Sequence, residues 1–367
     1  MIGVIGGYGK VGLQTTRLLK EWGKFPLRIG GRNPEKARAR FGDEFPQVEW
    51  TKVDVEDDES LETFLNGCEL VINCAGPSYR TSARVAQMCI SKGCHCIDAG
   101  MGKNLKISDG SPHDTAIIYD AGATPGLSGL LPRWLAGSFD KVDHLSVYVG
   151  ALGRFTTSGA EDYLIGVLDE TNNEPLAAWR NGVKCSSVLT RKSGISLPFF
   201  PREVTVYPYF DAEAEFVAKV LSLRDGEWYI AVDGEHGSAA LEEARAYFHS
   251  DPAGAVERLC LASRLDSAGR QTYVNFLVQL DGVKHAMPIT HTLVLQANEI
   301  SILSGSVAAI AGIALLEGEI PINIGSLATI PYPDVVIARL RDTQNVSQFK
   351  IFDCGIDGLL QTVEGEV

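Results

Sequence analysis

The sequence predicts an α/β protein in which a doubly wound parallel sheet is joined to a second α+β domain of mixed or antiparallel sheet. Two observations predict the first domain. A glycine-rich turn follows a short apolar run at the start of the chain, and strand-like and helix-like segments then alternate. A third observation predicts the second domain, because the middle of the chain holds strand-like segments rich in β-branched and aromatic residues.

Composition narrows the class of protein. A chain of 367 residues, 45% hydrophobic and 22% charged, is typical of a globular protein with two or three domains. The formal net charge of −13 argues against nucleic acid or an anionic membrane as the main partner. We expect the eight cysteines to be reduced thiols and recognise no signal peptide, which favours the cytoplasm. The apolar segment from Ile300 contains three serines and predicts a buried helix rather than a membrane span.

The opening sequence MIGVIGGYGKVG has the pattern of a nucleotide-binding turn. Its glycines form G-x-G-x-x-G between the strand-like IGVI and the helix-like LQTTRLLKEWG. We expect Gly7 to permit the tight turn, Gly9 to leave room for a pyrophosphate, and Gly12 to let the helix pack closely on the strand. The free N–H groups of the helix N-terminus favour an anion. The sequence therefore predicts a dinucleotide site of the Rossmann type, formed by Gly7, Tyr8, Gly9, Lys10, Val11 and Gly12.

The end of the next strand predicts which dinucleotide binds. In NAD-binding domains an acidic residue about 20 positions after the turn bonds the ribose 2′-hydroxyl. Here the strand FPLRIGG ends in Gly30 and Gly31, and Arg32 and Asn33 follow. Because no carboxylate would repel a 2′-phosphate and a guanidinium is placed to pair with it, we assign Arg32 and Asn33 to NADP. The alternative is that Arg32 is a solvated loop charge.

Four further strand-like segments continue the alternation. VEWTKVDV ends in Asp54 and Val55, which we expect beside the adenine. ELVINCAGP is nearly all apolar, as expected of a strand buried on both faces, and its end at residues 73–77 lies where such sheets bind ligands. CHCIDAG and TAIIYDAG end in Asp98 and Asp120. The candidate proton donors are the groups at these strand ends, Tyr79, Asp98 and Asp120, although Asp98 could equally cap the next turn.

The segment CISKGCHC raises the question of a metal site. On a strand, Cys94 and Cys96 point to one face and His95 to the other, so these three side chains cannot close around one ion. We therefore expect buried thiols and no metal. Cys74, at the crevice, could be a nucleophile, but no histidine neighbours it in the sequence.

The middle of the chain is expected to form its own domain over residues 137–304, while residues 1–136 and about 305–367 form the first. DHLSVYVGAL, REVTVYPYF, EWYIAV, QTYVNFLVQL and HAMPITHTLVLQA are strand-like, and helix-like segments separate some of them. A sheet of this kind is a natural lid over a ligand crevice and a natural surface for a homodimer.

The order of several motifs resembles the saccharopine dehydrogenase-like oxidoreductases. The motifs are GGYGKVG, GGRNPEKA, VINCAGP, CIDAG and AGATPGLSGLLPRWLA, followed much later by a small-residue helix running into LLEGEI. The resemblance implies an NADP domain, a second domain of mixed sheet inserted after the sixth strand, and a C-terminal segment that returns to the first domain. Around the ribose and nicotinamide it implies Ala75, Gly76, Pro77, Asp98, Ala99 and Gly100.

Family members reduce C=N bonds when they form secondary amines, and relatives act as trans-acting enoyl reductases. We therefore expect an NADPH-dependent reductase of a C=N bond in a small, carrier-bound or peptide-bound substrate. Reduction of a C=C bond and a non-catalytic NADP sensor remain alternatives. A short-chain dehydrogenase is disfavoured, because no tyrosine is followed four residues later by the lysine on which that class depends. No clamp of arginines for a dicarboxylic amino acid is recognised.

Overall fold

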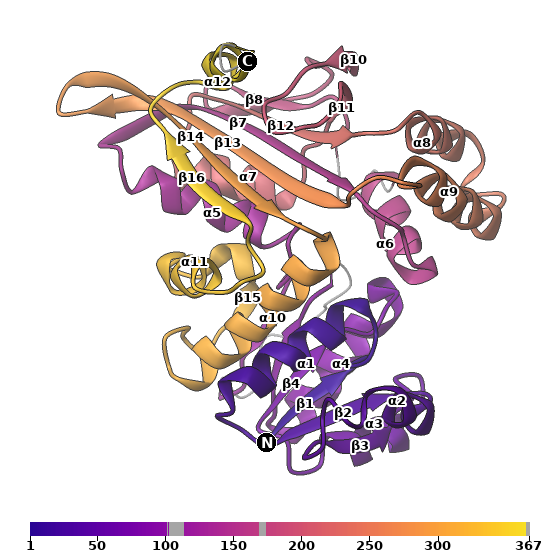
Figure 1. Cartoon of the computed structure of the whole chain (residues 1–367). Helices are drawn as coiled ribbons and strands as arrows, with labels where there is room; N and C mark the ends of the chain where they lie inside the picture. The colour runs from indigo at the N-terminus through magenta and orange to yellow at the C-terminus, as the bar shows by residue number, and fades with distance from the viewer. Residues whose placement is uncertain (101, 103–113, 169–173, 365–367) are drawn as a thin grey trace. The chain divides into compact units, whose positions relative to one another are not determined.

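The structure is a computed structural model that describes residues 1–100, 102, 114–168 and 174–364 (Figure 1). The chain forms two compact units. Unit 1 comprises Met1–Leu127 and Ser301–Asn345, and unit 2 comprises Ser128–Ile300 and Val346–Val367. The chain therefore leaves unit 1, builds most of unit 2, returns, and ends in unit 2.

The described residues of unit 1 form a seven-stranded sheet in the order β15-β6-β5-β4-β1-β2-β3, and neighbouring strands pair in parallel. This order is that of a doubly wound sheet extended by β15, which confirms the predicted Rossmann-like fold. The strands are β1 (Ile2–Ile5), β2 (Leu27–Gly31), β3 (Glu49–Lys52), β4 (Leu70–Asn73), β5 (His95–Asp98), β6 (Ile117–Tyr119) and β15 (Ile324–Ser326).

Helices of unit 1 cover this sheet, and α10 does so from far along the chain. Thr15 on α1 donates a hydrogen bond to the carbonyl of Gly305 at 3.0 Å, and a Cβ placed at Gly312 would lie 2.9 Å from the side chain of Ile72 on β4. The expectation of a buried helix from Ile300 is confirmed. The helices are α1 (Lys10–Trp22), α2 (Pro34–Phe41), α3 (Asp58–Leu65), α4 (Ser78–Lys92), α10 (Ile300–Leu316), η1 (Leu327–Thr329) and α11 (Asp334–Arg341).

Unit 2 is built on a mixed sheet in the order β10-β11-β12-β7-β13-β14-β16, and off this path β8 pairs with β12 and β9 pairs with β8. Only the β7–β12 pair is parallel among these described strands, so the predicted mixed sheet is confirmed. The strands are β7 (Lys141–Leu152), β8 (Ala178–Arg180), β9 (Val183–Cys185), β10 (Lys192–Ile195), β11 (Val204–Pro208), β12 (Asp225–Val232), β13 (Tyr273–Lys284), β14 (Met287–Ala297) and β16 (Gln348–Phe352).

Helices lie on both faces of this second sheet (Figure 1). The guanidinium of Arg133 on α5 lies 5.5 Å from the ring centre of Phe216 on α7, so these two helices pack together. On the opposite face, Gln279 accepts the N–H of Ile356 at the start of α12 at 2.8 Å. The helices are α5 (Leu127–Ala136), α6 (Thr157–Leu168), α7 (Ala212–Val220), α8 (Glu235–Tyr247), α9 (Pro252–Asp266) and α12 (Ile356–Glu364).

The end of the chain differs from the arrangement expected from the sequence. Residues 305–367 were expected to belong to the first domain, but β16 pairs antiparallel with β14 in the second sheet. Trp134 on α5 packs edge-to-face against Phe349 at 5.3 Å, which gives the last strand an aromatic partner inside unit 2. Residues 128–136, expected in the first domain, also fall in unit 2.

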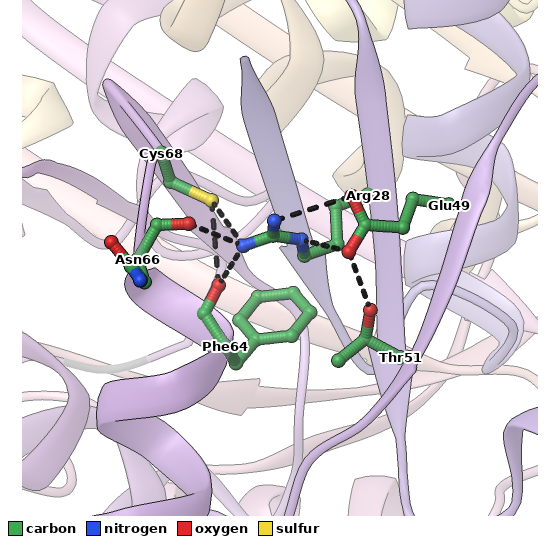
Figure 2. A network of polar contacts seen from close by, with 6 residues as sticks. All are labelled: Arg28, Glu49, Thr51, Phe64, Asn66 and Cys68. Atoms are coloured by element: carbon green, nitrogen blue, oxygen red, sulfur yellow. Dashed lines mark hydrogen bonds and ion pairs between the residues drawn. The ribbon is translucent and has the colours of Figure 1, made fainter.

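Arg28 ties together the elements at the amino-terminal edge of the first sheet (Figure 2). Its guanidinium lies on Glu49 of β3, with Nε–Oε1 and Nη2–Oε2 distances of 2.9 and 3.2 Å. Its Nη1 donates to the carbonyls of Phe64 and Asn66 at 2.6 and 2.7 Å and contacts the sulfur of Cys68. These carbonyls end helix α3 and lack helical partners of their own, so Arg28 joins β2, β3 and α3.

Candidate cofactor site

The glycine turn between β1 and α1 is shaped by close contacts that exclude side chains. Gly6 has a φ of +72°, and a Cβ placed there would lie 2.9 Å from the backbone nitrogen of Ala75. A Cβ at Gly7 would lie 2.6 Å from the side chain of Ile29, and one at Gly12 would lie 2.2 Å from the carbonyl oxygen of Gly6. The left-handed residue of the turn is therefore Gly6 rather than Gly7, whereas Gly7 and Gly12 supply the space for close packing.

Helix α1 begins directly after the glycine turn, and the N–H of Gly9 donates to the carbonyl of Gly6 at 2.8 Å. Gly9 is its N-cap residue, in extended conformation and with no side-chain cap. No acidic residue lies in the first turn, and Gly9 and Lys10 are exposed while Val11 is half-buried. A helix start beside a turn from which Cβ atoms are excluded fits the pyrophosphate of a dinucleotide.

Arg32 follows β2 directly and is exposed. Within the described parts of the chain its guanidinium makes no hydrogen bond or ion pair, and no acidic side chain lies at positions 30–33. Asn33 is the N-cap residue of α2, and its N–H is bonded to the hydroxyl of Tyr8. An unpaired guanidinium at this strand end fits a 2′-phosphate.

Asp54 and Val55 lie in the loop between β3 and α3. The backbone N–H of Asp54 donates to the hydroxyl of Ser60 at 3.0 Å, and its carboxylate accepts the N–H of Glu56 at 3.1 Å. Val55 is half-buried and packs against the core of the sheet. The carboxylate of Asp54 therefore holds its own loop, and a contact with adenine is a proposal for these two residues.

Asp98 and Asn73 join the carboxyl ends of β4 and β5. The amide of Asn73 donates to Asp98 at 2.7 Å, and the other oxygen of Asp98 accepts the N–H of Gly100 at 2.8 Å. Asp98 is 1% exposed. The side-chain oxygen of Asn73 accepts the N–H of Ala75, and its backbone carbonyl accepts that of Ala99. This network fixes the segments to which Ala75, Gly76, Pro77, Ala99 and Gly100 belong.

The two remaining candidate proton donors are more accessible than Asp98. Tyr79 lies in the first turn of α4, where its hydroxyl accepts a hydrogen bond from Nε of Arg80 at 2.7 Å. The same guanidinium carbon lies 5.3 Å from the tyrosine ring centre. Asp120, with a φ of +54°, follows β6, and its carboxylate accepts the N–H of Gly102 at 3.1 Å. Sequence reasoning missed Arg80, although it is the next residue after Tyr79.

The cysteines near this edge are poor nucleophiles. Burial raises the pKa of the Cys74 thiol to about 12, although its contact with the hydroxyl of Thr15 opposes that shift. His95 is turned to the backbone, because its ring accepts the N–H of Ala116 at 3.0 Å. Across the residues that the structure describes, no group of three or more His, Cys, Asp or Glu side chains could hold a metal ion.

Comparison with protein families decides the identity of the first unit. Residues 2–122 match the family model described as saccharopine dehydrogenase NADP binding domain. These residues belong to that domain family. The first unit thus contains an NADP-binding domain of this kind, and NADP is its cofactor. The matched range contains every residue that the sequence assigned to the cofactor.

Solved structures extend the likeness to the whole fold. Apo saccharopine dehydrogenase (L-Glu forming) from Saccharomyces cerevisiae is similar over 96% of this chain and 99% of its own, with a TM-score of 0.68 and 14% identity. DAP dehydrogenase of C. glutamicum in complex with DAP matches over 91% of this chain and 94% of its own, with a TM-score of 0.47 and 12% identity. At 14% identity the likeness to the Saccharomyces cerevisiae enzyme shows the fold alone. Comparison with curated protein sequences gives no match. Within the described residues, no helix has the length and apolar character needed to cross a bilayer.

Proposed function

We propose that this protein is an NADPH-dependent reductase that transfers hydride to a C=N bond of a weakly charged substrate, either small or held on a carrier or peptide. The observation that carries the proposal is the match of residues 2–122 to the saccharopine dehydrogenase NADP-binding domain. The resemblance of the wider motif order to enzymes that form secondary amines supports C=N as the acceptor. An iminium is already electrophilic, so its reduction needs little from the protein besides placement.

NADPH supplies the hydride, and the residues of unit 1 hold the cofactor in position. The proposed assignment is that the start of α1 at Gly9 faces the pyrophosphate and Arg32 pairs with the 2′-phosphate. The buried pair of Asn73 and Asp98 fixes the strand ends beside which the ribose and nicotinamide would lie. Both carboxylate oxygens of Asp98 already accept hydrogen bonds, which favours an anchoring role over proton transfer.

Tyr79 is the proton donor that we favour. Its hydroxyl already accepts a hydrogen bond from the guanidinium of Arg80, and a cation beside a phenol stabilises the phenolate that remains after the proton has left. Asp120 is the second choice, because its carboxylate already bonds a backbone N–H in its own loop.

The reaction is tested by the position of a label. NADPH deuterated at C4 is supplied with candidate imines and with enoyl thioesters, and the product is analysed by mass spectrometry and NMR. We expect deuterium on a carbon that bears nitrogen. Deuterium on the carbon β to a carbonyl would replace the proposal with reduction of a C=C bond. If NADPH binds tightly and neither substrate class consumes it, the result would favour the alternative that the protein is a non-catalytic NADP sensor.

We also propose that the protein is a cytoplasmic homodimer. All eight cysteines are free thiols, which suits a reducing compartment. The mixed sheet of unit 2 is a surface of the kind on which two copies can pair.

A further inference from the structure

Tyr8, inside the glycine turn, reaches across to the end of β2. Its hydroxyl oxygen accepts the backbone N–H of Asn33 at 2.7 Å. Its ring lies against Gly31, where an added Cβ would lie 2.3 Å from the tyrosine oxygen and 2.4 Å from Cζ. Gly31 therefore leaves room for the tyrosine in this position, and a residue with a Cβ there would displace the tyrosine ring.

The bond from Tyr8 acts on the peptide group next to Arg32. The N–H that it accepts belongs to the peptide bond between Arg32 and Asn33, and a peptide group is planar. Fixing this N–H therefore fixes the plane and the backbone from which the Arg32 side chain starts. The side chain of Asn33 forms no cap at the start of α2 among the residues that the structure describes. The tyrosine hydroxyl thus connects the turn that faces the pyrophosphate to the loop that carries the guanidinium.

The tyrosine is suited to this place beside a phosphate. Burial raises the pKa of Tyr8 above its usual value, although the Asn33 N–H and the charge of Arg32 lower it in part. The hydroxyl is therefore neutral at physiological pH and adds no negative charge near the 2′-phosphate. It can accept a hydrogen bond from the backbone without competing for Arg32.

We propose that Tyr8 is a positioning residue that gives selectivity for NADPH over NADH by holding the Arg32–Asn33 peptide in the orientation from which Arg32 meets the 2′-phosphate. The inference rests on the proposed NADP site and adds to it a residue that acts through Arg32. Without the bond, the loop would have to be ordered when NADPH binds, and that ordering would weaken NADPH binding. NADH has no 2′-phosphate, so its binding does not depend on the direction of the Arg32 side chain.

The test uses the full chain and cofactor binding alone. Tyr8→Phe keeps the ring over Gly31 and removes only the acceptor oxygen. We expect the Kd for NADPH to rise about three- to tenfold, as for the loss of one hydrogen bond, and the Kd for NADH to change less than twofold. Tyr332→Phe, at a tyrosine that is 65% exposed, is the matched control and should change neither value. Fluorescence titration gives both constants, and a thermal melt verifies that each variant is folded.

A double-mutant cycle separates this role from others. In an Arg32→Ala background, Tyr8→Phe should leave the Kd for NADPH unchanged within twofold, because the residue through which Tyr8 acts is gone. An additive effect, or equal weakening of NADPH and NADH by Tyr8→Phe, overturns the positioning role. If Arg32→Ala weakens NADPH binding more than NADH binding and Tyr8→Phe changes neither, the role of Tyr8 is overturned and the assignment of Arg32 stands. If Arg32→Ala itself weakens NADPH and NADH equally, the assignment of Arg32 to the 2′-phosphate fails, and the role of Tyr8 fails with it.

Discussion

Two arginines at opposite ends of β2 have opposite surroundings. Arg28, at the amino end, has a side chain that is 12% exposed, and it bonds a carboxylate and two helix-ending carbonyls (Figure 2). Arg32, just past the carboxyl end, is exposed and makes no hydrogen bond or ion pair within the described parts of the chain. The difference teaches that two arginines on one strand can be told apart by their partners inside the protein, and it is the reason why we propose a structural role for Arg28 and a ligand-binding role for Arg32.

Among the variants that test this comparison, Arg28→Ala should change the free energy of unfolding most. The substitution removes the arginine from the carboxylate of Glu49 and from the carbonyls of Phe64 and Asn66. Thr51 still donates to Glu49, and the thiol of Cys68 still donates to Phe64. We expect the free energy of unfolding to fall by about 2 to 3 kcal/mol. Urea denaturation followed by circular dichroism measures it. Arg28→Lys, which keeps the charge but not the planar fork, should recover less than half of the loss.

The Kd for NADPH should change little in Arg28→Ala under conditions where the protein is folded, because Arg28 lies at the sheet edge away from the glycine turn. If Arg28→Ala reduced the free energy of NADPH binding as much as the free energy of unfolding, Arg28 would contribute to the cofactor site and its contrast with Arg32 would be wrong.

Arg32→Ala should show the reverse pattern. Loss of a charge-assisted pair with a phosphate should weaken NADPH binding by about 1.5 to 3 kcal/mol, whereas the free energy of unfolding should change by less than about 0.5 kcal/mol. Isothermal titration with NADPH and NADH, together with urea denaturation, measures both quantities. Equal weakening of the two cofactors would mean that Arg32 is a solvated loop charge.

The smallest expected effect is the pH dependence of the stability that Glu49, the carboxylate partner of Arg28, contributes. The hydrogen bond from Arg28 lowers the pKa of Glu49 below its usual value of 4.5, and burial opposes this shift only in part. A carboxyl with a lowered pKa in the folded state stabilises the protein above about pH 4.5, and this contribution is lost as the pH falls through the lowered pKa. Glu49 has a side chain that is 47% exposed, so Glu49→Gln should cost less than about 1 kcal/mol at pH 7.

The difference in unfolding free energy between wild type and Glu49→Gln should therefore narrow as the pH falls below about 4.5. Urea titrations at several pH values follow it. A difference that stays constant down to pH 3 would show that the ion pair with Arg28 does not stabilise the fold.

The sequence predicted what depends on local pattern. The glycine turn and the strands up to β6 were predicted correctly because their signals lie within a few residues of each other. The partner of β16 was missed, because QFKIF carries an alternation that fits either sheet and pairing is decided by distant residues such as those of β14. Residues 128–136 lie in unit 2 rather than in the first domain for a similar reason, because α5 contacts α7 and β16.

The details of the site were harder to predict than its place. Gly7 was expected to make the tight turn, but the positive φ lies at Gly6, because the pair Gly6–Gly7 offers two positions for it. The contact of Tyr8 with Gly31 and the bond of Arg80 to Tyr79 join residues whose side-chain directions no periodicity reveals. Of these, only the unusual Gly30–Gly31 pair carried a signal in the sequence.

Because α10 and β15 return to the first sheet from late in the chain, that sheet cannot be completed until most of the protein has been synthesised. About 170 residues separate Leu127 from Ser301, and chain elongation at about 5 to 20 residues per second takes roughly 10 to 35 s to cover them. During that interval β6 is an unpaired edge, because β15 is its outer neighbour in the sheet. The face of α1 that α10 later covers is also bare. The nascent first unit therefore exposes a strand edge and a helix face until α10 and β15 have been made.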